Sequence, residues 1–266
     1  MAGNLENYRT FPRLIGECGG KNFHLIHPSA DLTTVVNGTI RSAFEYSGQK
    51  CSACSRLYIP RSLSKEFFSQ MKEIMTKQLR IDTPLKFETF TSAVIDRNSF
   101  NRIRDYIDYA RSSSSTKIVV GGKYDDSVGF YIQPTLIETT DPKDKLMQEE
   151  IFGPVLTVYV YDDKKYDETV DLVNQTSKFA LTGAIFCQDK KILDRTRERL
   201  INAAGNLYLN DKSTGSVVNQ QPFGGARMSG TNDKAGGPHY LFRFSSPLSM
   251  KNMKQPLKTF KHISMQ

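Results

Sequence analysis

The sequence predicts an α/β domain built around a mainly parallel β-sheet. Short runs of β-branched residues alternate with amphipathic helical segments along most of the chain, an order typical of parallel strands joined by helices. The chain has 266 residues, of which 38% are hydrophobic, which is enough for a sizeable core. It contains no apolar run of about 18 residues or more, so we expect no membrane span.

The first predicted strand is NFHLI, residues 22–26. Asp31 then has the position and the side chain of a helix N-cap. A helix over residues 32–47 carries a set of apolar residues on one face: Val35, Val36, Ile40, Ala43 and Phe44. This face predicts packing of the helix against the sheet.

The remaining elements continue the alternation in order. Further strands are expected at 55–60, 117–122, 131–138, 154–161, 181–187 and 205–210. Further helices are expected at 62–80, 99–112, 166–176 and 189–203. The helix at 99–112 places Phe100, Ile103, Ile107 and Ala110 at helical spacing, which indicates a second buried face.

Regular structure is expected to end near residue 211. The stretch from 211 to 240 is rich in glycine, serine and asparagine, and loops of this length in compact domains usually bind a ligand. The segment LFRFSSPLSMK, residues 241–251, is predicted to be an edge strand that pairs outside its own domain.

Charge and cysteine content restrict the possible functions. The net charge is +8, but lysine and arginine are interspersed with acidic residues and form no basic stripe, so small anionic substrates fit such a surface as well as polynucleotides do. Four cysteines without a disulfide framework indicate a reducing compartment. The N-terminus has neither an apolar region nor an arginine-rich amphipathic pattern, so we expect no signal or transit peptide.

Cys51 and Cys54 have the C-x-x-C spacing of several kinds of site. A redox pair is disfavoured because the motif precedes a strand, whereas thioredoxin-like pairs begin a helix. A zinc site with His24 and His27 is disfavoured because residues three apart on a strand point to opposite faces. A single nucleophilic cysteine on a turn remains, beside the alternative of a small buried core residue.

Two charged neighbours favour the nucleophile. Lys50 is expected to favour the thiolate of Cys51, because a nearby positive charge lowers the pKa of a thiol. Glu17 lies in the glycine-rich segment GECGGKNF and offers a carboxylate base. A nucleophile with a separate base is the general plan of covalent catalysis.

Five segments, taken in order, make the chain resemble the NAD-dependent aldehyde dehydrogenase superfamily. They are GECGGKNF, GQKCSACSRLYIP, EEIFGPVLTVYVY, NLYLNDKSTGSVV and QQPFGGARMSGTNDKAGGPHYL. The forms CSACS, STGSVV and GTNDKAGGPHY resemble the branch that oxidises glutamate-γ-semialdehyde, formed from Δ1-pyrroline-5-carboxylate, to glutamate in proline breakdown.

The resemblance implies a role for each matching residue. Cys51 corresponds to the nucleophile that passes through a thioester, and Glu17 to the base that activates water; Cys54 is then a bystander. Glu150 corresponds to the carboxylate that holds the nicotinamide ribose of NAD, and Phe152 packs beside the same cofactor. No metal is implied.

The substrate residues implied by the resemblance lie in the late loop. Ser216 and the backbone of Gly215 would bind the substrate carboxylate as an anion-binding turn, and Phe223 would pack on its methylene stem. Asn219 stands where this branch is expected to have glycine. Asparagine tolerates a positive φ better than most residues, so the loop geometry is expected to survive.

The same resemblance divides the chain into three parts. Residues 1–17 are expected to be a remnant of the cofactor-domain junction, 18–238 the catalytic domain, and 239–266 an oligomerisation strand with a tail. It implies a homodimer or higher oligomer and the mitochondrial matrix. No phosphate-binding glycine loop precedes Glu17, so little NAD-dependent turnover is expected of the chain alone.

Two other functions remain open. The chain is also compatible with a non-catalytic binding or oligomer-interfering module, and with an esterase that uses Cys51 and Glu17 without a cofactor. A nucleic-acid role rests on the basic isoelectric point alone.

Overall fold

The computed structural model describes residues 2–217 and 219–265, and it has the predicted α/β architecture. A seven-stranded sheet runs in the order β10-β9-β1-β2-β7-β6-β3, in which only the β3–β6 pair is antiparallel. Its strands are β1 (Asn22–Ile26), β2 (Cys54–Pro60), β3 (Thr116–Val120), β6 (Thr135–Thr139), β7 (Val155–Tyr161), β9 (Thr182–Phe186) and β10 (Asn206–Leu209). The mainly parallel sheet predicted from the alternation is therefore confirmed.

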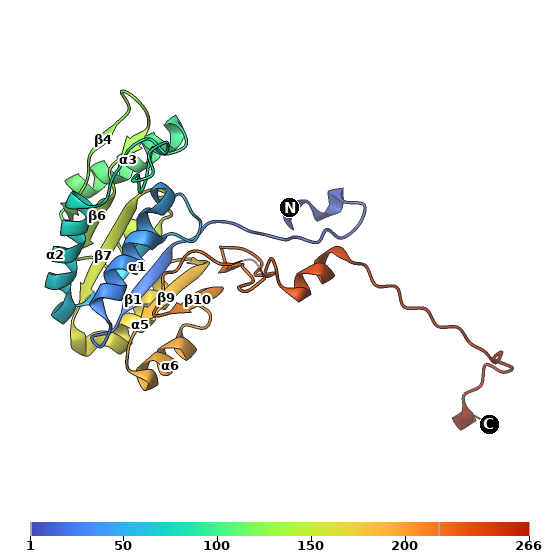
Figure 1. The fold of residues 1–266 in the computed structure, drawn as a ribbon. Coiled ribbons are helices and arrows are strands. Elements are labelled where there is room, and N and C mark those ends of the chain that lie inside the picture. The colour runs from blue at the N-terminus through green and yellow to red at the C-terminus, as the bar shows by residue number, and fades with distance from the viewer. Residues whose placement is uncertain (1, 218, 266) are drawn as a thin grey trace.

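Helices cover both faces of this sheet (Figure 1). The helices α1 (Leu32–Phe44) and α2 (Arg61–Lys77) pack on one face. The opposite face carries α3 (Arg97–Ser112), α5 (Tyr166–Thr176) and α6 (Lys190–Arg199). The sheet is thus buried on both sides, as parallel sheets generally are.

The remaining regular elements are short. They comprise α4 (Lys145–Gln148), η1 (Ala2–Asn7), η2 (Glu45–Gly48), η3 (Asp163–Lys165), η4 (Pro238–Phe244), η5 (Ile263–Met265), β4 (Tyr124–Asp125), β5 (Tyr131–Ile132), β8 (Phe179–Ala180) and β11 (Ala226–Arg227). β4 pairs with β5 and β8 pairs with β11, each antiparallel.

Aspartate caps start several of the helices. The carboxylate of Asp31 accepts a hydrogen bond from the backbone N–H of Thr34 at 2.8 Å, which confirms the predicted N-cap of α1. Asp96 caps α3 and Asp189 caps α6 in the same manner. Each cap satisfies a backbone N–H that the first helical turn leaves without a partner.

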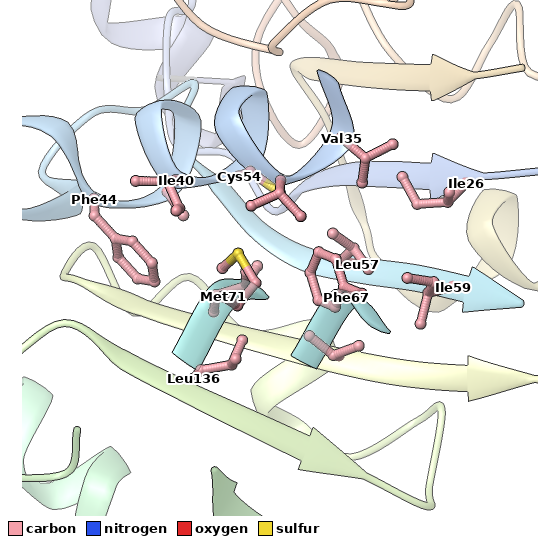
Figure 2. Close-up of a cluster of buried hydrophobic side chains, with 14 of the residues drawn as sticks. Ile26, Val35, Ile40, Phe44, Cys54, Leu57, Ile59, Phe67, Met71 and Leu136 are labelled. Atoms are coloured by element: carbon pink, nitrogen blue, oxygen red, sulfur yellow. The ribbon is translucent and has the colours of Figure 1, made fainter. Parts of the chain in front are cut away.

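The largest apolar cluster lies between α1, α2 and the sheet (Figure 2). Val35, Ile40 and Phe44 of α1 point toward Leu57 of β2 and Phe67 of α2, and all are buried. Burying a side chain of this kind contributes about 1.5–3 kcal/mol. The predicted apolar face of α1 is therefore its core face.

Several predicted elements differ in extent. The helix expected at 32–47 ends at Phe44, and the helix expected at 189–203 covers only Lys190–Arg199. The strand expected at 131–138 is divided into β5 and β6, because Pro134 has no backbone N–H to donate to a sheet ladder. The helix expected to reach residue 80 ends at Lys77.

The C-terminal segment differs from the expected edge strand. Its first residues, 241–244, belong to the 3₁₀ helix η4, and residues 245–262 form neither helix nor strand. Figure 1 shows this segment leading away from the domain on the same side as the N-terminal segment. Arg13 ties the two segments together by donating to the carbonyls of Phe242 and Arg243 at 3.4 and 3.2 Å.

Among residues 2–217 and 219–265, none of the helices is both long and apolar enough to cross a lipid bilayer.

Candidate active site

One cavity of about 690 Å³ gathers residues from four separate parts of the chain. Its wall contains residues that the sequence singled out, namely Cys51, Phe152, Gly215, Ser216 and Phe223. The rest of the wall comes from Gln49, Lys50, Ser52, Gln221, Ala235 and Gly236. The structure thus brings the predicted nucleophile and the predicted substrate residues to one place.

Cys51 stands on a turn with an unusual backbone. Tyr46, Ser47 and Gly48 all have positive φ, at 54°, 56° and 63°. Only glycine fits at position 48, because a Cβ there would lie 2.2 Å from the carbonyl oxygen of Gly153. Thr91 holds the turn by accepting a hydrogen bond from the backbone N–H of Ser47 at 2.9 Å. Left-handed residues of this kind need support from the surrounding structure.

The electrostatic surroundings of Cys51 differ from the prediction. Burial raises the pKa of the Cys51 thiol, and the negative charges of Glu17 and Glu150 raise this pKa further. Lys50 was expected to favour the thiolate, but its ammonium pairs with Glu45 at 3.0 Å. That expectation is therefore wrong for this structure, because Lys50 is held by another carboxylate.

Backbone hydrogen bonds have a smaller, opposite effect on the pKa of the Cys51 thiol. The N–H groups of Ser52 and Cys51 lower the pKa of the Cys51 thiol. Backbone N–H donors beside a nucleophile are also the kind of group that can stabilise the oxygen of a tetrahedral intermediate.

Cys54 is sealed in the core, with a side chain only 1% exposed. All four cysteines are free, and burial raises the pKa of the Cys54 thiol. His24 is buried against Thr39 and Ser213, and His27 is bonded to Ser29. Within residues 2–217 and 219–265 no group of three or more His, Cys, Asp or Glu side chains is placed to hold a metal ion.

Glu17 lies beside the cavity rather than in its wall. Its backbone forms a bridge with Gly230, and the next residue, Cys18, donates its N–H to the carbonyl of Ser229 at 2.9 Å. The Glu17 side chain is exposed, yet its charge reaches the thiol of Cys51 strongly enough to raise the pKa of that thiol. Glu17 and Cys51 therefore belong to one electrostatic neighbourhood.

Glu150 is held against a glycine turn. Its Oε1 accepts a hydrogen bond from the backbone N–H of Gly20 at 2.7 Å. A Cβ on Gly19 would come within 2.0 Å of Glu150 Oε2, so the close approach requires glycine. Phe152, with φ of 55°, places its ring in the cavity wall and is 37% exposed. Carboxylate oxygens accept hydrogen bonds from hydroxyls, so Glu150 beside the exposed ring of Phe152 is a combination of residue types that suits a nucleoside cofactor such as NAD.

Residues with a positive φ shape the late loop. Gly215 has φ of 84°, and Asn219 has φ of 66°, which confirms that a positive φ is needed at position 219. Ser216 Oγ donates to the carbonyl of Gln221 at 2.6 Å. Phe223 is fixed by a two-bond bridge to Ala235, at 2.9 and 2.8 Å.

The sequence analysis missed several wall residues. Gln221, Ala235 and Gly236 were not singled out, although all lie in the polar, glycine-rich stretch that was expected to bind a ligand. A second cavity of about 570 Å³ is lined by Glu150 together with Tyr106, Lys145, Gln148, Glu149, Lys178 and Phe179. Tyr106 donates its hydroxyl to Glu149 at 2.6 Å there.

This arrangement suits covalent chemistry on a small polar molecule. A half-buried thiol faces a hydroxyl and a positive-φ turn across one cavity, and carboxylates lie beside it. A thiol nucleophile with a nearby carboxylate base can form and hydrolyse an acyl intermediate.

Comparison with known proteins places this chain among aldehyde dehydrogenases. A family model described as the aldehyde dehydrogenase family matches residues 4–249. Mitochondrial Δ1-pyrroline-5-carboxylate dehydrogenases are 56% identical in Mus musculus and 55% identical in Homo sapiens, over 267 residues. Each alignment covers 100% of this chain and 47% of the relative, so the chain spans less than half the length of these relatives.

Solved structures agree. The Δ1-pyrroline-5-carboxylate dehydrogenase of Mycobacterium tuberculosis bound with NAD and cobalamin has a TM-score of 0.90 and 39% identity. That match covers 100% of this chain and 48% of the other. The corresponding Thermus enzyme with bound NAD has a TM-score of 0.81 and 32% identity, covering 88% of this chain and 44% of the other.

Proposed function

Because the chain belongs to the aldehyde dehydrogenase family, we propose that it is the catalytic part of an enzyme of proline catabolism. Its reaction is the oxidation of L-glutamate-γ-semialdehyde to L-glutamate with NAD. The single observation that carries the proposal is the cavity in which Cys51 faces Gly215, Ser216 and Phe223. The mammalian relatives described above are named Δ1-pyrroline-5-carboxylate dehydrogenases, which supports this reaction.

The thiolate of Cys51 attacks the aldehyde carbon and forms a thiohemiacetal. The backbone N–H of Cys51 then stabilises the negative charge on the former carbonyl oxygen. NAD, when bound, supplies the acceptor for the hydride that leaves this carbon, and a thioester on Cys51 remains. Glu150 and Phe152 are the residues that would hold the nicotinamide half.

Water then hydrolyses the thioester. Glu17 takes a proton from this water, the hydroxide adds to the acyl carbon, and the thiolate of Cys51 leaves as L-glutamate forms. The raised pKa of the Cys51 thiol makes its thiolate a stronger nucleophile in the first step, whereas the same raised pKa makes Cys51 a poorer leaving group in hydrolysis.

Substrate choice follows from the loop opposite the thiol. The semialdehyde carries a carboxylate and an ammonium at the end remote from its aldehyde. The backbone N–H groups of the positive-φ turn at Gly215 bind the carboxylate, and the ring of Phe223 covers the methylene carbons. Ser216 joins them when its hydroxyl leaves the Gln221 carbonyl and donates to the substrate instead.

Location and assembly follow the same relatives. The mammalian relatives are named mitochondrial, and we place this protein in the mitochondrial matrix by analogy. We assign self-association to the segment after η4, where apolar side chains such as Leu248, Met250 and Phe260 are 80%, 86% and 84% exposed. A second copy of the chain would cover them.

The test measures protection of Cys51 from iodoacetamide, read at the Cys51 peptide by mass spectrometry. L-glutamate-γ-semialdehyde should protect Cys51 at concentrations at least about tenfold lower than butanal, which lacks the charged head group. Equal protection by the two aldehydes would rule out the carboxylate-binding role of Gly215 and Ser216.

A further inference from the structure

A buried polar network lies directly behind the loop that carries Gly215 and Ser216. Ser213 Oγ is 2.8 Å from Ser42 Oγ of α1 and 3.2 Å from Nε2 of His24 in β1. The other ring nitrogen of His24, Nδ1, is 2.9 Å from Thr39 Oγ1 of α1. Strand, helix and loop are thus joined through one imidazole ring.

The network is sealed from solvent. His24, Thr39 and Ser213 are 0% exposed, and Ser42 is 1% exposed. Buried hydroxyls and imidazoles are costly unless they are hydrogen-bonded, so these groups strongly favour the one arrangement that pairs them all. Desolvation lowers the pKa of His24 to about 3, so the ring is neutral near pH 7. A neutral imidazole donates through one nitrogen and accepts through the other, and the hydroxyls of Thr39 and Ser213 can match either tautomer.

The network also reaches the nucleophile. Ser213 Oγ lies 3.5 Å from the backbone carbonyl of Ser52, the residue after Cys51. Thr182 of β9 donates its hydroxyl to the same carbonyl at 3.3 Å. Ser213 is therefore in reach of the nucleophile turn and lies two residues before Gly215 in the same loop.

We propose that Ser213, held by His24 and Ser42, is the positioning residue that fixes the Gly215–Ser216 turn relative to Cys51. It touches neither substrate nor cofactor in this arrangement, because it is absent from the cavity wall and acts through the loop. Its effect is on how tightly the cavity holds a carboxylate. The identity of that carboxylate rests on the proposed function, whereas the geometry of the network does not depend on it.

The chain supplies a matched control at the far end of the same strand. Ser29 also bonds a histidine, with Oγ 2.9 Å from His27 Nδ1, and it accepts from the backbone of Gln188 at 3.0 Å. None of these residues lines the cavity. Ser29→Ala therefore removes a similar His–Ser contact without touching the loop.

The first measurement follows trypsin cleavage after Lys212 in the native chain. Ser213→Ala and His24→Asn should each speed this cleavage by about tenfold, because the loop loses its internal anchor. His24→Asn leaves the loop sequence unchanged, and the shorter amide keeps Thr39 in reach but not Ser213. Ser29→Ala should cleave at the wild-type rate. Wild-type cleavage in both network variants would overturn the proposal.

The second measurement uses L-glutamate, the product of the proposed reaction, as the probe. The concentration that halves iodoacetamide alkylation of Cys51 should rise about tenfold in Ser213→Ala, while the alkylation rate without glutamate stays within about twofold. The unchanged rate shows that the domain is folded and that the thiol itself is not displaced. Unchanged protection would overturn the positioning role. If glutamate fails to protect the wild type, the substrate assignment falls, and the cleavage rates alone decide the positioning role.

Discussion

The seven-stranded sheet and the segment 211–237 that follows it are stabilised in different ways. The sheet depends on continuous backbone ladders and on apolar clusters packed against both of its faces. The segment depends on single contacts, such as the ammonium of Lys234, which donates to the carbonyl of Gly224 at 2.9 Å. It also contains several residues with positive φ: Gly215, Asn219, Arg227, Gly230, Asn232, Lys234 and Gly236.

The two regions therefore contribute differently, the sheet mainly to stability and the segment 211–237 mainly to the cavity wall. The sheet buries most of the apolar surface and therefore supplies most of the folding free energy. The segment buries little and instead holds backbone groups at the cavity wall. Changes in the sheet should alter stability with little effect on the site, and changes in the turns around the cavity should do the reverse.

The sharpest test compares the two cysteines of the C-x-x-C motif. Cys51 lines the cavity, whereas Cys54 lies in strand β2 of the sheet. Cys51→Ala should leave the cavity without a thiol that iodoacetamide can label, because no other thiol lines the cavity described here. Its free energy of unfolding should change by less than about 1 kcal/mol. Cys54→Ala should keep the wild-type rate of iodoacetamide labelling at Cys51 and lose about 1–2 kcal/mol of unfolding free energy, because a buried sulfur is removed from the core. Iodoacetamide labelling in the cavity of Cys51→Ala would contradict the assignment of the nucleophile.

A core substitution tests the other side of the division. Phe67→Ala removes a ring that is 0% exposed between α2 and the sheet, and should cost about 3–5 kcal/mol of unfolding free energy in a urea titration. Phe87→Ala is the control, because that ring is fully exposed and its loss should change stability by less than about 0.5 kcal/mol. Below the unfolding transition, Cys51 of Phe67→Ala should be alkylated at the wild-type rate.

Glu17→Gln tests the electrostatic link across the cavity edge. Burial and then the charge of Glu17 raise the pKa of the Cys51 thiol above 9.0. A negative neighbour disfavours the thiolate, so removing its charge lowers this pKa and increases the thiolate fraction at every pH below it. Alkylation of Cys51 at pH 7.5 should therefore become about twofold to threefold faster.

The same variant should slow thioester hydrolysis, because the amide cannot take a proton from water. A rate of alkylation that falls in Glu17→Gln would show that the carboxylate does not act on the thiol through its charge.

The smallest expected effect is at Asn219, where the loop departs from the glycine expected by resemblance. Asn219→Ala places a residue with a Cβ and no local hydrogen-bonding group at φ of 66°, and should cost about 1 kcal/mol. Asn219→Gly should stay within about 0.5 kcal/mol of the wild type. Equal unfolding free energies for Asn219→Ala and Asn219→Gly would show that the loop relaxes away from this conformation.

Much of the fold could be predicted because its signals are local. The apolar residues from Val35 to Phe44 recur at helical spacing, and Asp31 marks the start of that helix, so α1 follows from adjacent residues alone. The division of the expected strand at 131–138 shows the limit of such reasoning. The apolar pattern continues through Pro134, but a sheet ladder needs backbone donors that proline lacks.

The residues of the site could be predicted from the sequence better than the charges and hydrogen bonds that surround them. Cys51, Phe152, Gly215, Ser216 and Phe223 share one cavity, and the resemblance had singled out each of them. The effect of Lys50 was mispredicted, because its partner Glu45 is brought to it by the η2 turn. The network of His24 and Ser213 gave no signal at all, since its two residues are 189 positions apart.

The sequence by itself determined the order of strands and helices and the N-cap of α1, because these depend on side-chain periodicity and residue type over a few neighbouring positions. Only the tertiary structure decided which side chains share the cavity, which carboxylates act on the Cys51 thiol and what anchors the loop opposite it. Burial and through-space distance set a pKa or a buried hydrogen bond, and neither quantity exists until distant segments of the chain are packed together.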